Sequence, residues 1–200
     1  MLLLRILHRI NTPTKPPLRP ASAASQISKM KLALLLALTA ATIPSATGTA
    51  LDGHTVTLPT TAPATILILG FSHKSADSTT AWEKPIRASL ATTPAIDYYD
   101  IPFLQDAPSF IRPLILRNIR KQIPDALKPH FLPLTTNESA WKQVANFSPD
   151  SPDAAYILLV DRSGKVRWQT HEPFTPARLI ELSTAAHTLD ASFPQNPATP

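Results

Sequence analysis

The sequence predicts an α/β protein with three layers, in which a mixed central sheet lies between helices. Two continuous apolar runs, at residues 65–71 and 155–161, are typical of strands that are buried on both faces. Segments with apolar residues at helical spacing alternate with further strand candidates, which is the pattern of layered α/β folds. The pattern covers residues 51–191, a length that suffices for one domain with a sizeable core.

The first half of this segment supplies a hairpin and a strand–helix–strand unit. Residues 51–58 contain an Asp-Gly turn followed by alternating apolar residues, which predicts an N-terminal β-hairpin. After the strand at 65–71, Thr79 or Thr80 is placed to cap a helix that ends near residue 91. Residues 95–103 form the next predicted strand.

The middle of the segment is less regular. A helix is predicted to begin at Pro113, because proline is favoured in the first turn of a helix. Residues 131–135 are a candidate for a short strand. Asn137 is placed to cap a further helix over residues 138–147.

The last part of the segment reads as a β-hairpin and a terminal helix. The buried strand at 155–161 passes through an Asp-Arg-Ser-Gly-Lys turn into a partner strand at 166–170. Thr175 and Pro176 then begin a helix whose apolar stripe extends to Leu189. Core packing is expected for all three tryptophans, each of which falls in a regular element: Trp82, Trp141 and Trp168.

Residues 30–50 have the pattern of a secretory signal peptide. Lys31 precedes an unbroken run of Leu, Ala and Thr, and small residues follow this run. The small residues predict cleavage after Gly48 or Ala50. An uncleaved anchor is the alternative, although the apolar run is shorter than the about 20 residues of a membrane span.

The two ends of the chain are predicted to be disordered. Residues 1–29 carry Arg among Leu, Ser and Pro and hold no acid, which is typical of a mitochondrial targeting peptide. Alternatively they lie upstream of a true start at Met30, which opens a complete signal peptide. Residues 192–200 hold three prolines and no periodic pattern, and form a tail.

The composition excludes several classes of function. The chain has no Cys, so it has no disulfide, thiolate metal site or thiol nucleophile, and its four Gly form no phosphate-binding motif. Residues 1–50 hold six of the nineteen Lys and Arg and no acid, so residues 51–200 carry thirteen basic groups against fourteen acidic ones. No nucleic-acid partner is therefore expected. The histidines lack metal-binding spacing, so no metal and no cofactor is expected.

Several stretches carry a resemblance to a known family. The opening LDGHTVTLP and the later run YILLVDRSGKVRW resemble the corresponding parts of exported thioredoxin-like and peroxiredoxin-like proteins. Together with GFSHKSADS and an Arg-rich helix from Arg112 to Lys121, they resemble the thioredoxin-like family of the mitochondrial ATP synthase assembly factor ten and its bacterial relatives. The resemblance covers Leu51 to Leu189, and it implies a thioredoxin-like fold and a role in assembling a membrane complex.

The chain departs from redox thioredoxins at the active-site loop. Where they carry CxxC, this sequence reads Ser75-Ala76-Asp77-Ser78, and a serine hydroxyl neither forms a disulfide nor ionises near neutral pH. Their cis-proline would fall near Ala155, whereas Pro152 lies three residues earlier. The resemblance therefore implies a thioredoxin scaffold without thiol chemistry.

The loop that follows the first buried strand remains a candidate ligand site, because helix N-termini attract anions. Its candidate residues are Ser72, His73, Lys74, Ser75, Asp77 and Ser78. In one interpretation Ser75 or Ser78 is an acyl-transfer nucleophile, with His73 as base and Asp77 orienting it. In a second, the loop binds a small anion or a peptide carboxylate. In the third, it is a solvated loop in which Asp77 or Ser78 caps the helix.

The Arg-rich helix offers a second candidate surface. Four isoleucines spaced by four residues share one face: Ile111, Ile115, Ile119 and Ile123. Arg117, Arg120 and Lys121 lie on the opposite face, and Arg112 stands just outside the helix start. An ordinary amphipathic helix would pack on the sheet and leave its basic face in water. Alternatively, these basic residues contact anionic lipid or an acidic loop of a membrane protein.

These observations favour a binding, chaperone or assembly factor over an enzyme. The protein is expected to be exported, periplasmic or secreted, and to act at a membrane complex or an anionic membrane surface; by resemblance, this is ATP synthase assembly. Association with the mitochondrial inner membrane is the alternative location. The alternative function is a small-ligand binder or a serine-dependent hydrolase that uses the Ser72–Ser78 loop. No oligomeric state is indicated.

Overall fold

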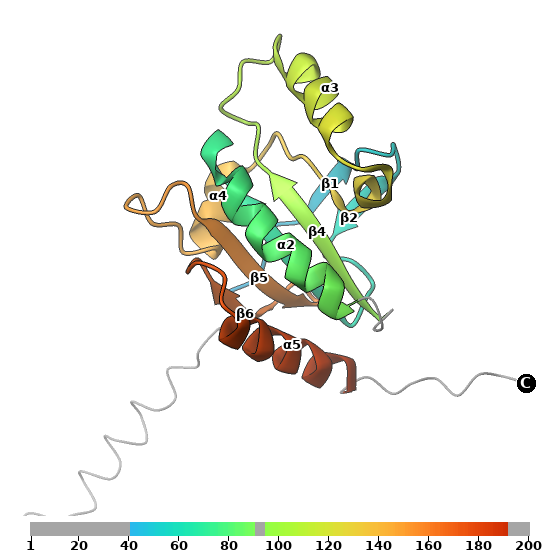
Figure 1. The fold of residues 1–200 in the computed structure, drawn as a ribbon, viewed down its shortest axis with the longest axis vertical. Coiled ribbons are helices and arrows are strands. Elements are labelled where there is room, and N and C mark those ends of the chain that lie inside the picture. The colour runs from blue at the N-terminus through green and yellow to red at the C-terminus, as the bar shows by residue number, and fades with distance from the viewer. Residues whose placement is uncertain (1–40, 91–94, 192–200) are drawn as a thin grey trace, which may run out of the picture. The chain divides into compact units, whose positions relative to one another are not determined.

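The computed structural model describes residues 41–90 and 95–191 (Figure 1). Two strands form an antiparallel hairpin: β1 (Ala46–Thr49) and β2 (Thr55–Leu58). Four more strands form a mixed sheet in the order β4 (Ile96–Pro102), β3 (Ala64–Gly70), β5 (Ala155–Asp161) and β6 (Val166–Thr170). The helical elements are η1 (His73–Ser75), α2 (Ala76–Leu90), α3 (Arg112–Gln122), η2 (Asp125–His130), α4 (Glu138–Val144) and α5 (Pro176–Ala191).

The strand directions define a thioredoxin-like fold. β3 runs parallel to β4, and the helix α2 connects the two. β5 and β6 are antiparallel neighbours on the other side of β3, and α5 follows them. This arrangement confirms the predicted α/β class, the mixed central sheet and the N-terminal hairpin.

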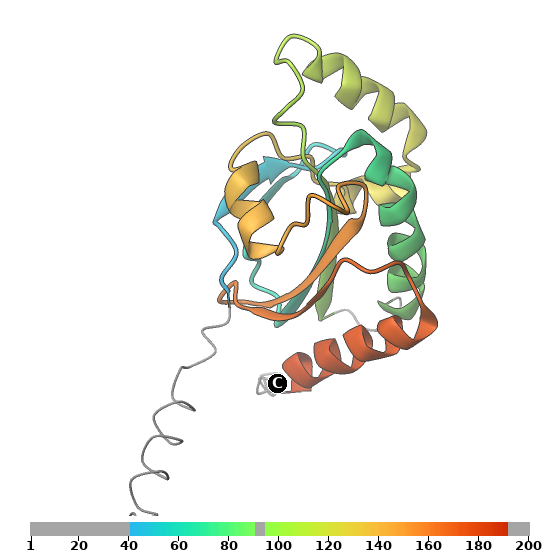
Figure 2. The same ribbon diagram turned by 90° about the vertical axis from the view of Figure 1, so that its left-hand side faces the viewer.

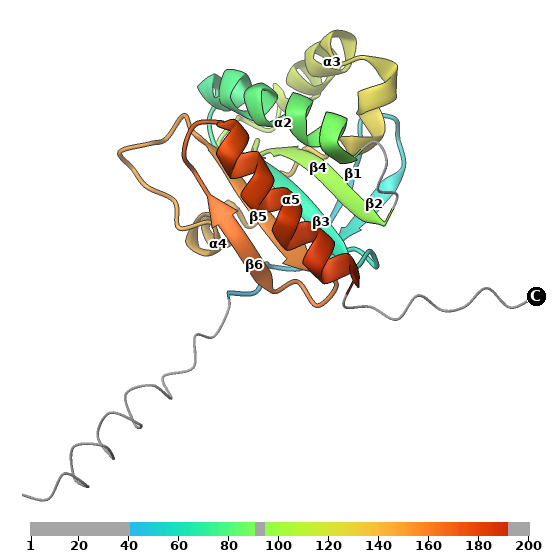
Figure 3. The same ribbon diagram turned by 60° about the horizontal axis from the view of Figure 1, so that its bottom comes forward.

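Helices cover one face of the sheet, and a helix and the hairpin cover the other (Figure 3). Ile66 and Ile68 of β3 pack against Trp82 of α2 and Leu182 of α5. Their neighbours in the strand face the opposite way, where Leu67 and Leu69 belong to a cluster with residues of α4 and β2. All seven residues of β3 and of β5 are buried, which explains their continuous apolar sequence.

Two of the tryptophans lie in the core as expected. Trp82 and Trp141 are fully buried. Trp168 is half-buried and packs edge-on against Trp82, with ring centroids 6.4 Å apart.

The folded region begins earlier than the sequence indicated. Residues 46–49, predicted to end the signal peptide, form β1 and pair with β2 around a turn in which Gly53 has φ 104°. Ile43 and Ala50 are buried in the core. Cleavage after Gly48 or Ala50 would therefore cut through the hairpin, and the cleavage site stays a prediction. Residues 1–40 and 192–200, with the predicted targeting segment, most of the leader and the tail, lie outside the described residues.

Two element boundaries also differ from the expectations. α2 begins at Ala76, so Thr79 and Thr80 lie inside the helix and do not cap it. Residues 131–134 form isolated parallel bridges beside β4 in place of a regular strand. The first difference is local, because the Ser72 Oγ accepts the Ser75 N–H and caps η1, which leads into α2. The second is tertiary, because backbone hydrogen bonds to the β4 edge position residues 131–134.

Candidate binding groove

The two candidate regions of the sequence form opposite walls of one cavity. Its volume is about 740 Å³, and it lies beyond the carboxyl ends of β3 and β4, where Figure 2 shows α3 standing above the sheet. We call this cavity the α3 groove. Its lining residues come from three places: Gly70, Phe71, Ser72, His73, Ser75, Ala76, Thr79 and Thr80; Asp100, Pro102, Phe103, Leu104, Asp106, Ala107 and Phe131; and Ile115, Asn118, Ile119, Gln122 and Ile123.

The serine hydroxyls hold the loop wall in place. Ser72 is the N-cap of η1, and its Oγ accepts the Ser75 backbone N–H at 3.1 Å. The Ser72 Oγ also donates to the Asp153 carboxylate at 2.6 Å, and the Ser78 Oγ donates to the Asp153 carbonyl at 3.0 Å. The loop is therefore fixed to the segment that precedes β5, and Ser72 caps where Asp77 or Ser78 was predicted to do so.

The described loop does not assemble a serine hydrolase. Ser75 is only 2% exposed, and its hydroxyl donates to the Ser72 carbonyl at 2.7 Å. His73 is exposed, and in the described part of the chain no hydrogen bond joins it to any of the three serines. Lys74 and Asp77 are exposed as well. A nucleophile needs hydrogen-bond contact with its base, so this geometry favours a structural role for the hydroxyls.

The α3 wall presents its apolar face to the groove. Ile115, Ile119 and Ile123 are half-buried and line it, and α3 has no fully buried residue. One interpretation of the sequence packed this apolar face on the sheet, whereas in the structure it lines a cavity. Leu114 on α3 is 57% exposed, and Phe110 just before the helix is 82% exposed.

The basic residues of α3 have two different environments. Arg112 is half-buried, and its guanidinium donates to the carbonyls of Ala107 at 2.8 Å and Gln105 at 2.7 Å. It therefore fixes the loop that leads into the helix, although the sequence grouped it with the contact residues. The remaining three side chains are exposed: Arg117, Arg120 and Lys121.

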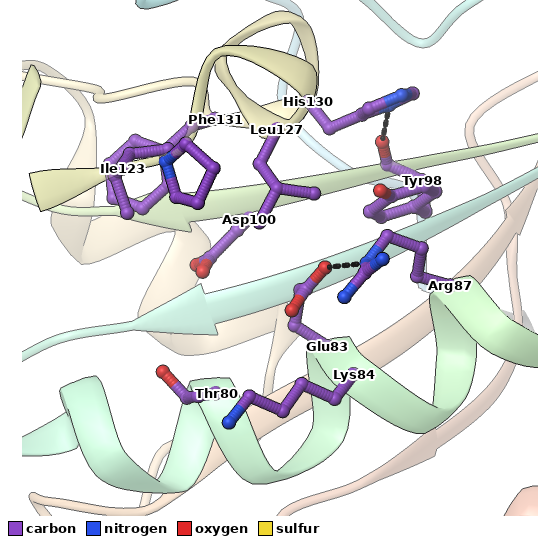
Figure 4. Close-up of a pocket in the computed structure, with 11 residues that line it drawn as sticks. Thr80, Glu83, Lys84, Arg87, Tyr98, Asp100, Ile123, Leu127, His130 and Phe131 are labelled. Atoms are coloured by element: carbon purple, nitrogen blue, oxygen red, sulfur yellow. Dashed lines mark hydrogen bonds and ion pairs between the residues drawn. The ribbon is translucent and has the colours of Figure 1, made fainter.

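A pair of acidic residues, the half-buried Asp100 and the buried Glu83, lies at one end of the groove, and sequence reasoning missed it. Of the two, only Asp100 lines the groove, and both line a neighbouring cavity of about 270 Å³ (Figure 4). Burial, and secondarily the Glu83 carboxylate, raise the pKa of Asp100 to about 7. Glu83 is buried and accepts a hydrogen bond from Arg87 Nε at 2.9 Å. The sequence held one signal for this pair. Asp100 lies two positions after the buried Tyr98, so both side chains point to the same face of β4.

The groups around the acidic pair come from three elements. The side chains of Lys84 and Arg87 reach the smaller cavity from α2, and His130 reaches it from η2. The His130 ring stacks on the Tyr98 ring, with centroids 4.1 Å apart. Burial, with the Glu83 charge as a second cause, raises the pKa of Tyr98 to about 12.

A third cavity lies on the other side of the serine loop. It measures about 480 Å³ and brings Asp77 and Ser78 together with His171 and Glu172, which follow β6. The Trp82 indole N–H donates to the Glu172 carbonyl at 3.2 Å and fixes this wall. Within residues 41–90 and 95–191, no three side chains of His, Cys, Asp or Glu are grouped to hold a metal ion. In the same ranges no helix has the length and apolar character needed to cross a membrane.

Comparison with known proteins gives matches in structure only. No family model and no curated protein matches the sequence. The chain is similar to BsSco, a member of the Sco family of cytochrome c oxidase assembly proteins, at 16% identity and TM-score 0.48, over 75% of this chain and 95% of that one. A Chlorobium tepidum protein described as the thiol:disulfide interchange protein DsbE matches at 16% identity and TM-score 0.48, over 76% and 96%. The exposed lipoprotein thioredoxin Etrx1 of Streptococcus pneumoniae matches at 13% identity and TM-score 0.48, over 72% of this chain and 99% of that one.

These likenesses transfer no activity to this chain, because identities and TM-scores are low. None of the comparisons supports the narrower resemblance to the assembly factor ten family. The fold follows from the order and direction of the strands. The chain has a thioredoxin-like fold and contains no cysteine.

Proposed function

We propose that this protein is an exported, redox-inactive thioredoxin-fold factor that binds a client in the α3 groove at a membrane complex. The observation that carries the proposal is the groove itself, which the serine loop and α3 form together. Its volume of about 740 Å³ is within the range of known ligand sites, and most of its lining is apolar.

The chemistry of the loop supports a binding function. The chain has no thiol, and the hydroxyls at positions 75 and 78 donate to backbone carbonyls. Binding of a small ligand is the second candidate function, because the α3 groove is also large enough for a small molecule. A hydrolase is not proposed, since His73 makes no hydrogen bond to these serines in the described structure.

The outer surface of α3 supports a location at a membrane. Arg117, Arg120 and Lys121 are exposed, and Leu114 and Phe110 expose apolar surface beside them. Basic residues near an anionic surface contribute about 1 kcal/mol each. On the basis of the sequence resemblance, the complex we propose is ATP synthase. On the basis of the leader, we propose export, with the mitochondrial inner membrane as the alternative location.

Charge reversal on α3 tests the membrane contact. In Arg117→Glu with Arg120→Glu, we expect binding to phosphatidylglycerol vesicles to fall by at least about 30-fold, because two attractive contacts are lost. Vesicle flotation measures this effect, and crosslinking in cells followed by mass spectrometry of the membrane fraction identifies the complex.

The control variant is Arg162→Glu with Lys165→Glu, which makes the same charge change elsewhere. These exposed residues lie in the β5–β6 turn, and the strand register places this turn at the opposite end of the sheet from α3. The control should retain binding. Equal binding by the α3 variant and the unaltered protein would refute the role of the basic face.

A further inference from the structure

We infer that the α3 groove accepts a client segment that combines a lysine or arginine side chain with apolar side chains. The cation would lie at Asp100, and the apolar side chains would lie along Ile115, Ile119 and Phe103. This inference rests on the proposed client-binding function and adds the chemistry that the client must have.

The charges that line the groove are acidic, although α3 itself is basic. The charged or titratable lining residues are Asp100, Asp106 and His73, and no Lys or Arg lines the groove in the described structure. The exposed basic residues of α3 are absent from this lining, which contains the isoleucine face and the neighbouring amides Asn118 and Gln122. The interior is therefore complementary to a cation and unfavourable for the anion or peptide carboxylate of the second interpretation of the loop.

The apolar walls lie within reach of the acidic end. Phe71 and Phe103 stack at a centroid distance of 4.8 Å, and Phe103 lines the groove three residues after Asp100. Ile123 and Phe131 line both the groove and the smaller cavity that holds Glu83. An apolar segment can thus be buried while one basic side chain reaches the carboxylates, as in sites where few polar groups orient a mainly apolar ligand.

Asp100 lacks a partner for its charge. Within the described residues no hydrogen bond reaches its carboxyl group, and its pKa is about 7 because of burial and of Glu83. A bound cation would favour the ionised carboxylate, so affinity should rise with pH through 7. The titratable and charged groups around it are Glu83, Lys84, Arg87, Tyr98, His130, His73 and Asp106; Arg87 is already paired with Glu83.

Three synthetic peptides test the inference on the folded protein. They are acetylated, amidated heptapeptides rich in leucine and phenylalanine, with lysine, norleucine or glutamate at the centre. Isothermal titration calorimetry at pH 8 should show that the lysine peptide binds at least tenfold more tightly than the norleucine peptide and that the glutamate peptide binds least. The preference for lysine should shrink at pH 6.

Protein variants then locate the cation. Asp100→Asn should lower the affinity for the lysine peptide to that of the norleucine peptide and remove the pH dependence. Asp97→Asn lies on the same strand but outside the groove lining, so it should change neither the affinity for the lysine peptide nor its pH dependence. Asn118→Arg places a cation in the groove at an exposed position, so it should abolish lysine selectivity without disturbing the fold.

The outcomes separate this inference from the proposed function. Equal affinities for the three peptides, or an unchanged lysine preference in Asp100→Asn, overturn the inference and leave the membrane contact of α3 untouched. Binding of 4-phenylbutylamine without binding of the lysine peptide assigns the groove to small amines and also overturns it. The opposite result is also informative. If the peptide selectivity persists and Arg117→Glu with Arg120→Glu leaves vesicle binding unchanged, only the membrane role is refuted.

Discussion

Single residues decide what the serine loop and the groove can do. The hydroxyls of Ser75 and Ser78 donate to the carbonyls of Ser72 and Asp153. Asp100 is the opposite case, since no hydrogen bond to its carboxyl group is present among the described residues and burial raises its pKa to about 7. The loop residues therefore stabilise the site, whereas Asp100 is the group available to a ligand.

The raised pKa of Asp100 predicts a specific dependence of stability on pH. The folded pKa of about 7 lies above the reference value of 3.8, so the native state binds the extra proton between these values. The contribution of Asp100 to the free energy of unfolding is thus complete below pH 4 and is lost as the pH rises toward 7. Asp100→Asn, which stays neutral, should be more stable than the unaltered protein at pH 8 and lose this advantage at pH 5.

Urea denaturation at pH 5, 6, 7 and 8 measures this difference. Asp97→Asn, which removes a carboxylate from the same strand outside the groove lining, is the matched control. A stability difference for Asp100→Asn that does not change between pH 5 and 8 would contradict the pKa assigned to the carboxyl group.

The elements differ strongly in how they are held. β3 and β5 bury every residue, so they join both core clusters at once. α3 buries none, and its apolar face lines the groove. An amphipathic sequence thus predicts the helix itself, but it leaves open whether the apolar face meets a sheet or a cavity.

The exposure of α3 predicts low local stability. Because few buried contacts hold it, its amide hydrogens should exchange at least about tenfold faster than those of α2, which packs on the sheet. Hydrogen exchange with mass spectrometry resolves the two helices. The lysine peptide should slow exchange in α3 and leave α5 unchanged, since α5 does not line the groove. Equal protection of α2 and α3 in the free protein would contradict this assignment.

At the scale of the whole molecule, the hairpin belongs to the fold. The Ile43 N–H donates to the Gly164 carbonyl at 2.8 Å, and the Val166 N–H donates to the Ala41 carbonyl at 2.8 Å. These bonds connect the start of the described chain to the β5–β6 turn. Gly48 lies so close to residues 132 and 134 that a Cβ there would meet Leu132 at 2.9 Å, which shows how tightly the hairpin packs.

Truncation tests this integration. A chain that begins at Ala41 retains the hairpin and should be as stable as the full chain, whereas a chain that begins at Leu51 loses β1 and buried Ile43. Loss of one buried isoleucine side chain costs about 2–5 kcal/mol, and a domain has only about 5–15 kcal/mol in total, so the shorter chain should unfold or aggregate. Tryptophan fluorescence in urea measures both chains, and equal midpoints would show that the hairpin is dispensable.

The sequence by itself determined the fold class and the chemistry that is absent. The continuous apolar runs predict β3 and β5, because strands that are buried on both faces are apolar throughout. The lack of Cys excludes thiol chemistry in any structure. The start of the fold was misread, because small residues serve a signal-peptidase site and a short edge strand equally well. The early start of α2 follows from η1, where the Ser72 Oγ accepts the Ser75 N–H and donates to the Asp153 carboxylate.

Only the tertiary structure decided where the candidate residues meet. Ser72 and Ile119 are far apart in the sequence, yet they line one cavity, because β3 and β4 run parallel and end at the same edge of the sheet. Asp100 looked like an ordinary strand residue, and its pKa depends on burial and on Glu83 from α2. Local pattern predicts elements, whereas the charge and shape of a site depend on which elements the fold brings together.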